Sequence, residues 1–165
     1  MESARAVLYE GAVTVVTPDG APAQAVAAVE GLWTAVGSLV IRMDAGDHDR
    51  IIARTSHLPH MAAALVSLCA GRGGFDGESV SALCGPGIRD TTRVAEGSPE
   101  VWHDIAWTNR DAIVGELEAM GDALAEMVRR LRAEEFDGVR GLLAEAREAR
   151  RRVVPARGVS TEEPA

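Results

Sequence analysis

The spacing of apolar residues changes twice within the first 45 residues, and each spacing predicts a different element. Residues 12–17, AVTVVT, form a short β-branched run that ends in a Pro-Asp-Gly turn, which is typical of a strand. In residues 22–36 apolar side chains recur every three or four positions, which predicts a helix. Residues 38–43, SLVIRM, predict a second short strand. Together they predict a right-handed β-α-β unit with parallel strands.

The pattern after this unit is helical. Two parallel strands are too few for a stable sheet, because parallel sheets normally have several strands and both faces covered. The unit therefore resembles the last part of a larger parallel sheet. A glycine-rich loop is predicted over residues 71–78. The predicted helices span residues 47–70, 79–84, 99–132 and 136–152.

The helix predicted over residues 99–132 would be about 50 Å long at 1.5 Å per residue. Its apolar side chains lie on more than one side, and a monomer of this size would leave much of that surface exposed. We therefore expect an obligate homodimer. The arginine-rich stretch over residues 129–157 is interpreted as a solvated helix face rather than an anion-binding tail. Residues 154–165 are expected to be a disordered tail.

The chain has 165 residues, of which 47% are apolar, and this is the size and make-up of one compact soluble domain. It has no uncharged apolar run of about 18 residues and no basic-then-apolar start. No membrane partner or secretion signal is predicted, and the cytoplasm is the expected location. Cys69 and Cys84 are too few for a disulfide framework, and we expect both to be buried apolar fillers.

The net charge of −8, from 25 acidic and 17 basic residues, opposes attraction to phosphate backbones, so nucleic acid is not an expected partner. All 17 basic residues are arginine, so the chain lacks the lysine that a P-loop or a Schiff base needs. A Gly-x-Gly-x-x-Gly fingerprint is also absent. A nucleotide-dependent enzyme with its own cofactor site is therefore not predicted for this chain.

A polar stripe runs along the apolar helix predicted over residues 47–70. At 100° per residue Asp49, Ser56 and His60 share one stripe, with His57 beside it. Buried hydroxyl and imidazole groups need hydrogen-bond partners or a cavity, because leaving one unpaired costs roughly 1–3 kcal/mol. Pro59 removes one helical hydrogen bond, so a kink with a free carbonyl is predicted beside Ser56. Ser56, His57 and His60 are the candidate catalytic residues.

A second cluster of candidate binding residues lies in GPGIRDTTR, residues 85–93. Its glycines, including Gly87, let backbone N–H groups approach a ligand, and its arginines and threonines, including Thr92 and Arg93, offer a receptor for a carboxylate. Asp90 could orient one of the arginines. The alternative, which stays open at this point, is a surface loop in which arginine and aspartate pair with each other.

The spacing of His57 and His60 raises the question of a metal site. No helix-borne third ligand is evident and Pro59 disturbs the spacing, so no metal is predicted. Trp102 and Trp107 follow on the next predicted helix, where aromatic side chains usually belong to the core.

Several of these motifs together resemble the C-terminal half of the prephenate and arogenate dehydrogenase family, over roughly residues 3–130. The lead-in LYEGAVTVVTP at 8–18 is similar to the segment that closes that family's nucleotide-binding domain. The matching motifs are HD at 48–49, SHLPH at 56–60, GPGIRDTTR at 85–93, SPEVWHDI at 98–105 and the asparagine of TNRDAI at 109.

The resemblance implies a mainly α fold: a long-helix, intertwined dimerisation and substrate-binding domain over residues 46–153, preceded by a β-α-β remnant of a Rossmann-like sheet over residues 1–45. It also implies roles for individual residues. His60 and Ser56 would face the substrate, and His57 would support the site from outside it. Arg93 would bind a substrate carboxylate, with Asp90 and Trp102 supporting the pocket.

The resemblance further implies where the redox chemistry belongs. In that family the dinucleotide fingerprint and the histidine that polarises the substrate hydroxyl lie in the preceding nucleotide-binding domain, whose fingerprint this sequence lacks. We therefore expect no cofactor in this chain, NAD(P) only with a separate nucleotide-binding chain as partner, and no hydride transfer by this chain alone.

Three functions remain open at this stage. The first is a dehydrogenase-like domain of the tyrosine-biosynthesis type that dimerises and binds a small, prephenate-like carboxylate. The second is a cofactor-independent enzyme that uses the same histidines and arginine for acid–base chemistry, such as dehydration, decarboxylation, isomerisation or cyclisation. The third is a regulatory module that senses a metabolite without turning it over.

Overall fold

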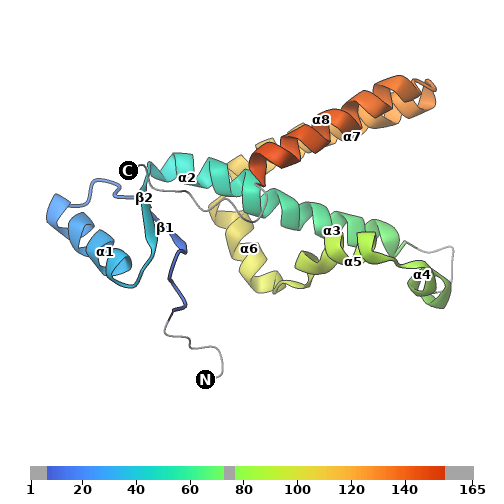
Figure 1. Cartoon of the computed structure of the whole chain (residues 1–165). Helices are drawn as coiled ribbons and strands as arrows, with labels where there is room; N and C mark the ends of the chain where they lie inside the picture. The colour runs from blue at the N-terminus through green and yellow to red at the C-terminus, as the bar shows by residue number, and fades with distance from the viewer. Residues whose placement is uncertain (1–6, 73–76, 155–165) are drawn as a thin grey trace, which may run out of the picture. The chain divides into compact units, whose positions relative to one another are not determined.

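The computed structural model describes residues 7–72 and 77–154 (Figure 1). The described part of the chain is mainly helical, as predicted, with a small parallel sheet near its N-terminus. It divides into two compact units, residues 1–116 and residues 117–165, and each is described by itself. The division expected between residues 45 and 46 stays a prediction about sequence domains.

The β-α-β unit is confirmed. Strands β1 (Val13–Val16) and β2 (Leu39–Arg42) pair in parallel, with Val13 opposite Leu39. Helix α1 (Ala23–Ala35) connects them. The chain leaves α1 through Gly37 at a φ of +88°, a backbone conformation that favours glycine, and Gly37 accepts a hydrogen bond from the amide of Gly11.

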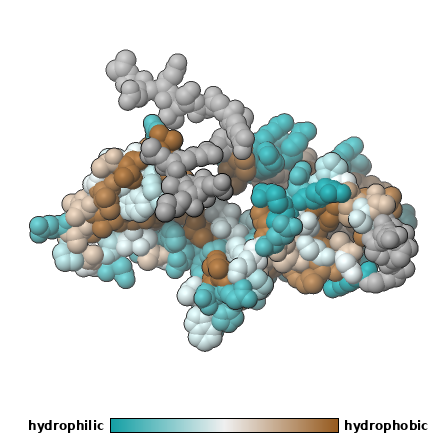
Figure 2. All heavy atoms as spheres, turned by 90° about the horizontal axis from the view of Figure 1, so that it is seen from below, coloured by the Kyte–Doolittle hydropathy of each residue, from teal (hydrophilic) through white to brown (hydrophobic). Residues whose placement is uncertain are grey.

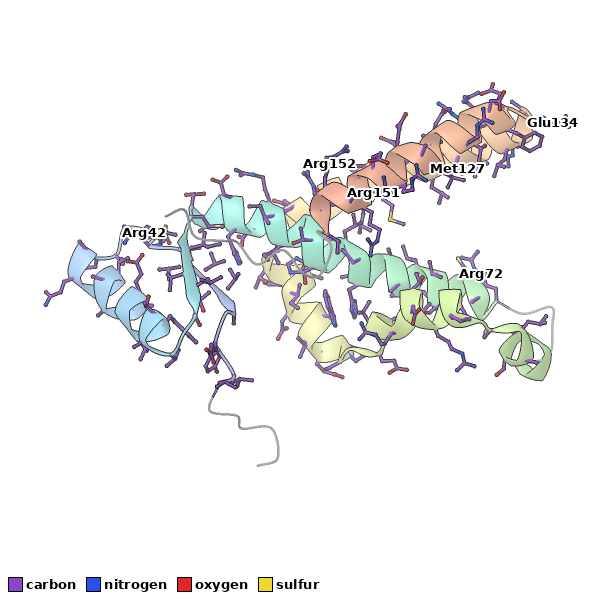
Figure 3. All side chains as sticks on the ribbon, in the orientation of Figure 1. Arg42, Arg72, Met127, Glu134, Arg151 and Arg152 are labelled. Carbon is purple, nitrogen blue, oxygen red and sulfur yellow. The ribbon has the colours of Figure 1, made fainter. Side chains whose placement is uncertain are left out.

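This unit keeps an apolar surface. Only Val26 among its hydrophobic side chains is buried, while Val13 and Leu39 are about 60% exposed. An apolar hollow of about 310 Å³ lies between β1 and α1 and is lined in part by Trp33. Figure 2 shows apolar residues in brown along the left of its view, where this unit lies. Arg42, the last residue of β2, forms an ion pair with Glu30 of α1 (Figure 3).

The long helix expected over residues 47–70 is three segments. Helix α2 (Ala45–Ile52) starts earlier than predicted, because the Asp44 carboxylate caps it by accepting from the amides of Gly46 and Asp47. A π-helical turn, η1 (Ala53–His57), follows, and the amide of Leu58 reaches back to the carbonyl of Ala53. Helix α3 (Leu58–Ala70) then begins with Pro59 in its first turn. The predicted kink is thus a widened turn.

The segment GPGIRDTTR, for which a surface loop was the alternative interpretation, is helical. Helix α5 (Pro86–Thr92) begins with proline at its first position, where the missing amide hydrogen costs nothing. A 3₁₀ turn, η2 (Arg93–Glu96), continues it. The short helix predicted over residues 79–84 is present as α4 (Gly77–Leu83). Residues 73–76 of the predicted glycine-rich loop lie outside the described residues.

The single helix expected over residues 99–132 is also wrong. Helix α6 (Pro99–Thr108) and helix α7 (Arg110–Arg132) are separated at Asn109, whose φ of −118° and ψ of 31° leave the helical region. The oxygen of Ser98 caps α6 by accepting from the amide of Val101.

The second unit is a hairpin of α7 from Leu117 onward and α8 (Phe136–Val153), which run antiparallel (Figure 1). Arg129 forms ion pairs with Glu126 on its own helix and with Glu135 before α8. Arg130 donates to the carbonyl of Gly138 at 2.8 Å. Met127 on α7 and Arg151 and Arg152 on α8 are labelled in Figure 3. Of the tail expected over residues 154–165, residues 155–165 lie outside the described residues.

Few side chains are buried among the described residues. The buried hydrophobic residues there are Val26, Ala53, Ala63 and Ile113. Cys84 is half-buried, which partly meets the expectation of buried cysteines. Cys69 is exposed, so the expectation is wrong there, because Cys69 lies in the last turn of α3, beyond its buried residues His60 and Ala63. None of the described helices is both long enough and apolar enough to cross a membrane.

Candidate functional site

The π turn decides which polar side chains of the histidine-bearing helix are buried. His57 ends that turn and His60 follows in the first turn of α3, and each is only 8% exposed. Ser56 is exposed. The stripe expected to join Asp49, Ser56 and His60 is therefore wrong, because one extra residue in the π turn rotates everything before it relative to α3.

Both histidines contact the same tryptophan. The imidazole of His60 stacks on the indole of Trp102, with ring centroids 3.4 Å apart and planes 11° apart. His57 meets the same indole edge-on, at 6.0 Å and 87°. Trp102 comes from α6, so this contact joins the histidine-bearing helix to a segment 40 residues later.

The η2 turn closes over this stack. A Cβ at Gly97 would lie 3.0 Å from Cε1 of His60 and 2.6 Å from Nε1 of Trp102, so the backbone comes as close as glycine allows. The carbonyl of Val94 also interacts with His60. Arg93, the residue before Val94, is exposed, and among the described residues it has no ion-pair partner.

The remaining side chains of GPGIRDTTR either bond to nearby backbone carbonyls or are exposed to solvent. The Thr92 hydroxyl donates to the carbonyl of Ile88 at 2.6 Å, inside its own helix. Arg89 donates to the carbonyl of Cys84 at 3.2 Å. Asp90 and Gly87 are exposed, and within the described ranges neither Arg89 nor Arg93 pairs with Asp90. The structure thus does not contain the arginine–aspartate pairing of the alternative reading.

Burial controls the charge state of both imidazoles. It lowers the pKa of His57 below the ordinary histidine value, an effect that the Asp49 carboxylate opposes and His48 reinforces. Burial also lowers the pKa of His60, and the carbonyl of Val94 opposes that shift. Both rings are therefore neutral at pH 7. Each can donate one hydrogen bond and accept another, which suits them to bind polar groups and to transfer protons.

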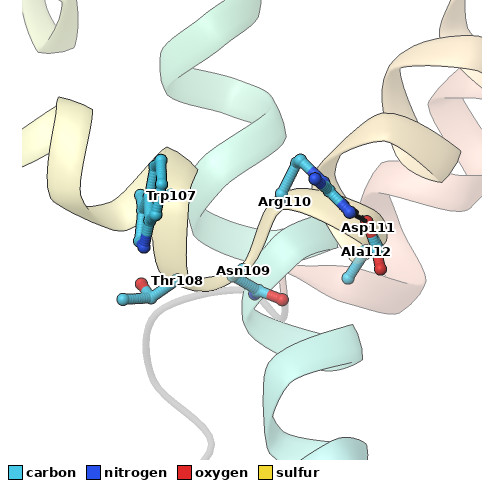
Figure 4. A pocket seen from close by; sticks show the side chains of 6 residues that line it. All are labelled: Trp107, Thr108, Asn109, Arg110, Asp111 and Ala112. Atoms are coloured by element: carbon cyan, nitrogen blue, oxygen red, sulfur yellow. Dashed lines mark hydrogen bonds and ion pairs between the residues drawn. The ribbon is translucent and has the colours of Figure 1, made fainter.

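Asn109 joins this group, although the sequence indicated it only as part of a motif. Its Nδ2 donates to the backbone carbonyl of Asp49 at 2.8 Å and lies 3.3 Å from Nδ1 of His57. Figure 4 shows it at the junction of α6 and α7, beside a surface hollow of about 420 Å³ lined by residues 107–112. That hollow includes the ion pair of Arg110 with Asp111 and none of the predicted site residues.

Gly97 is a site residue that the sequence did not indicate, and Asn109 was indicated only as part of a family motif. Asn109 interrupts an otherwise helical run just before a charged pair, and an asparagine there is a weak sign of a helix break. Gly97 precedes the Ser-Pro start of α6, where a glycine looks like an ordinary linker residue. Its close approach to two aromatic rings depends on long-range packing.

The turn between β1 and α1 does not fit the pyrophosphate of a dinucleotide. A pyrophosphate-binding turn between a strand and a helix needs several close backbone N–H groups. Here the turn from β1 to α1 contains Pro18 and Pro22, which have no amide hydrogen, and Asp19, which would repel a phosphate. In the part of the chain that the structure describes, no group of three or more His, Cys, Asp or Glu side chains is arranged to hold a metal ion.

Comparison with known proteins shows which family this chain is similar to. The family model described as prephenate dehydrogenase, dimerization domain, matches residues 44–145. The cyclohexadienyl dehydrogenase of Zymomonas mobilis is 34% identical over 115 residues, which are 68% of this chain and 39% of that protein. The prephenate dehydrogenase of Bacillus subtilis is 30% identical over 113 residues, which are 68% of this chain and 30% of that protein.

Solved structures of two such enzymes are also similar. Synechocystis arogenate dehydrogenase matches with a TM-score of 0.76 and 27% identity, over 90% of this chain and 54% of that one. Prephenate dehydrogenase from A. aeolicus, in complex with hydroxyphenyl propionate and NAD+, matches with a TM-score of 0.82 and 25% identity, over 92% of this chain and 54% of that one. This chain spans about half the length of these solved relatives and 39% or less of the curated ones.

Proposed function

The chain belongs to the prephenate dehydrogenase dimerization-domain family, and on that premise we propose that it forms a homodimer and binds a small carboxylate of the prephenate type. Hydride transfer from such a ligand needs a nicotinamide, and the β1–α1 turn of this chain is poorly suited to bind a dinucleotide. We propose that a separate nucleotide-binding polypeptide or domain supplies it. The two parts of the proposal, dimer and ligand, rest on different residues and are tested separately.

The dimer is supported by the lack of a core in the second unit. None of the side chains from residue 117 to residue 154 is buried. A two-helix hairpin without buried side chains gains too little hydrophobic free energy to hold its shape alone. Its large exposed apolar side chains are Leu124, Val128, Leu131, Phe136, Leu143, Val153 and Val154. A second copy would cover such a surface without any further partner.

Sedimentation or light scattering of the full chain tests the dimer. We expect a dimer for the wild-type chain and a shift toward monomer for Leu124→Glu and for Leu131→Glu, because a buried carboxylate opposes association. Arg132→Glu introduces the same side chain beside Leu131 at an exposed polar position and should leave the dimer in place. A monomeric wild-type chain would refute this part of the proposal.

The ligand site is supported by one observation above all: η2, which begins with Arg93, packs against the stacked pair of His60 and Trp102. An exposed guanidinium without an acidic partner among the described residues is free to bind a carboxylate through two parallel hydrogen bonds. The His60 ring against which η2 packs is neutral and brings no competing charge, although its one N–H faces the carbonyl of Val94.

Calorimetric titration with prephenate and with arogenate tests the ligand. We expect binding to the wild-type chain and at least a tenfold loss for Arg93→Ala, because charge-assisted hydrogen bonds are worth about 1.5–3 kcal/mol. Arg93→Lys keeps the charge but loses the fork and should recover only part of the affinity. Arg42→Ala, which removes an exposed arginine paired with Glu30, is the control. Equal binding by wild-type and Arg93→Ala chains would contradict the site.

The same samples test the alternative of acid–base chemistry without a nicotinamide. Ultraviolet spectra recorded during incubation with prephenate distinguish binding from turnover. Unchanged spectra with heat of binding support a binding domain. A spectral change that disappears in both His60→Ala and Arg93→Ala would support a cofactor-independent enzyme instead.

A further inference from the structure

The Asn109 side chain contacts two segments that lie 60 and 52 residues earlier in the chain. Its amide nitrogen donates to the carbonyl oxygen of Asp49 at 2.8 Å, and the same nitrogen lies 3.3 Å from Nδ1 of His57. Asn109 itself sits in the non-helical break between α6 and α7, which Figure 4 shows from close by. One primary amide therefore joins α2, the π turn and the α6–α7 junction.

These two contacts determine the direction of the hydrogen bond to His57. A backbone carbonyl only accepts, so the amide nitrogen of Asn109, and not its oxygen, must face Asp49. That nitrogen also faces His57, and an amide NH₂ group only donates. Nδ1 of His57 must therefore accept. A neutral imidazole that accepts at Nδ1 carries its proton on Nε2.

The opposite nitrogen of the ring is accessible. Within residues 7–72 and 77–154, Nε2 of His57 has no hydrogen-bond partner, and no buried side-chain nitrogen or oxygen there lacks one. Nε2 therefore reaches the accessible surface, although the residue as a whole is only 8% exposed. Among the described residues no group accepts a proton from Nε2.

We propose that Asn109 is a positioning residue that holds His57 in the Nε2–H tautomer, so that His57 offers a neutral N–H donor to an oxygen of the bound acid. The tautomer is a property of the free protein. Only its use toward a ligand rests on the function proposed above.

The charges around His57 are consistent with a neutral ring. Asp49 from α2 favours the protonated form and His48 from the same helix disfavours it, while burial lowers the pKa. Nδ1 of His48 in turn lies 3.0 Å from the Asp49 carboxylate. The groups that face His57 from the other side, Asn109 and Trp102, carry no charge. A protonated His57 would turn an N–H toward the Asn109 amide hydrogens, which further disfavours that form.

Long-range ¹H–¹⁵N NMR correlation on the ¹⁵N-labelled full chain tests the tautomer directly. At pH 7.5 we expect a pyridine-type nitrogen at Nδ1 of His57 and a pyrrole-type nitrogen at Nε2. The opposite assignment, or two equally populated tautomers, would overturn the proposal. Because this measurement uses the wild-type chain, it does not depend on whether any variant folds.

Two substitutions separate positioning from packing. Asn109→Asp places an acceptor where the donor stood, so the proton should move to Nδ1 and the pKa of His57 should rise. Asn109→Ala should leave a mixture of tautomers. Thr108→Ala, next in the chain and bonded only within α6, is the matched control and should leave the wild-type tautomer. An unchanged tautomer in a folded Asn109→Asp chain would refute the role of Asn109.

Titration with prephenate distinguishes this inference from the proposed function. If both hold, prephenate shifts the Nε2 resonance of His57, and Asn109→Ala weakens binding by roughly fivefold. If Nε2–H is observed but prephenate shifts no histidine resonance, the tautomer stands and the proposed use of His57 toward the ligand fails. If prephenate binds but Nδ1 carries the proton, the ligand site stands and the role of Asn109 fails.

Discussion

Gly97 lies so close to Trp102 that a Cβ on the glycine would be 2.6 Å from Nε1 of the indole. The same Cβ would be 3.0 Å from Cε1 of His60, which stacks on that indole. Three residues from three different segments thus meet at van der Waals distance. The backbone of η2 can approach the stack only because residue 97 has no side chain.

Replacing Gly97 by alanine tests this close approach. The added methyl group must displace either ring, and overpacking of this kind costs about 1–3 kcal/mol in free energy of unfolding. Gly31→Ala in α1, where a Cβ meets nothing within 4 Å, should instead stabilise by about 0.5–1 kcal/mol. Urea unfolding of both variants measures the two effects, and destabilisations of the same size would argue against a specific clash at Gly97.

Removing Trp102 should loosen the packing around both histidines. We expect Trp102→Ala to lower the free energy of unfolding by about 3 kcal/mol, because a large ring is lost. Since burial is what lowers the pKa of His60, that pKa should rise toward its ordinary value. Trp102→Phe keeps an aromatic face and should retain most of the stability. NMR titration of His60 in the three chains checks the pKa, and a value unaffected by Trp102→Ala would speak against the stack as the source of burial.

Stability should fall on mild acidification. Burial lowers the pKa of His57 and of His60 below the ordinary value of about 6.5 that both have in the unfolded chain. The unfolded chain therefore takes up protons first as the pH falls. The histidine contribution to stability is fully present above about pH 6.5 and is lost as the pH falls toward the folded pKa values.

Urea unfolding at pH 7.5, 6.5 and 5.5 measures this pH dependence. His60→Gln should flatten the decrease, because it removes one of the two buried titrating groups. His103→Gln removes a histidine that is 74% exposed and should leave the decrease as in the wild type. The prediction is contradicted if lowering the pH from 6.5 to 5.5 raises the free energy of unfolding of the wild type but not that of His60→Gln.

The start of α2 depends on one carboxylate. Asp44 Oδ1 accepts from the amides of Gly46 at 2.8 Å and Asp47 at 3.1 Å. Asp44→Ala should cost about 1 kcal/mol in free energy of unfolding, and Asp44→Asn should restore most of it, because asparagine caps nearly as well. Denaturant unfolding compares the three chains. A similar loss for alanine and asparagine would mean that the charge, and not the cap, stabilises this end.

The local elements follow from residue spacing wherever a segment interacts mainly with itself. The short β-branched runs around Val13–Val16 and Leu39–Arg42 and the three-to-four spacing of α1 and α8 each predicted the observed element within a few residues. The SHLPH motif also indicated the turns in which the structure buries His57 and His60. These signals are readable because backbone hydrogen bonds and one-sided burial repeat within a few residues.

The sequence by itself therefore determined both strands and most of the helical segments, and it indicated the family through its motifs. Only the tertiary structure decided that the helix widens at Ala53–His57, that it breaks at Asn109, and that His57 rather than Ser56 is buried. The reason is physical: the bonds of Asn109 to Asp49 and His57, and the stack of His60 on Trp102, join residues 40 to 60 positions apart. Such contacts leave no periodic trace in the chain, because packing and not local spacing selects them.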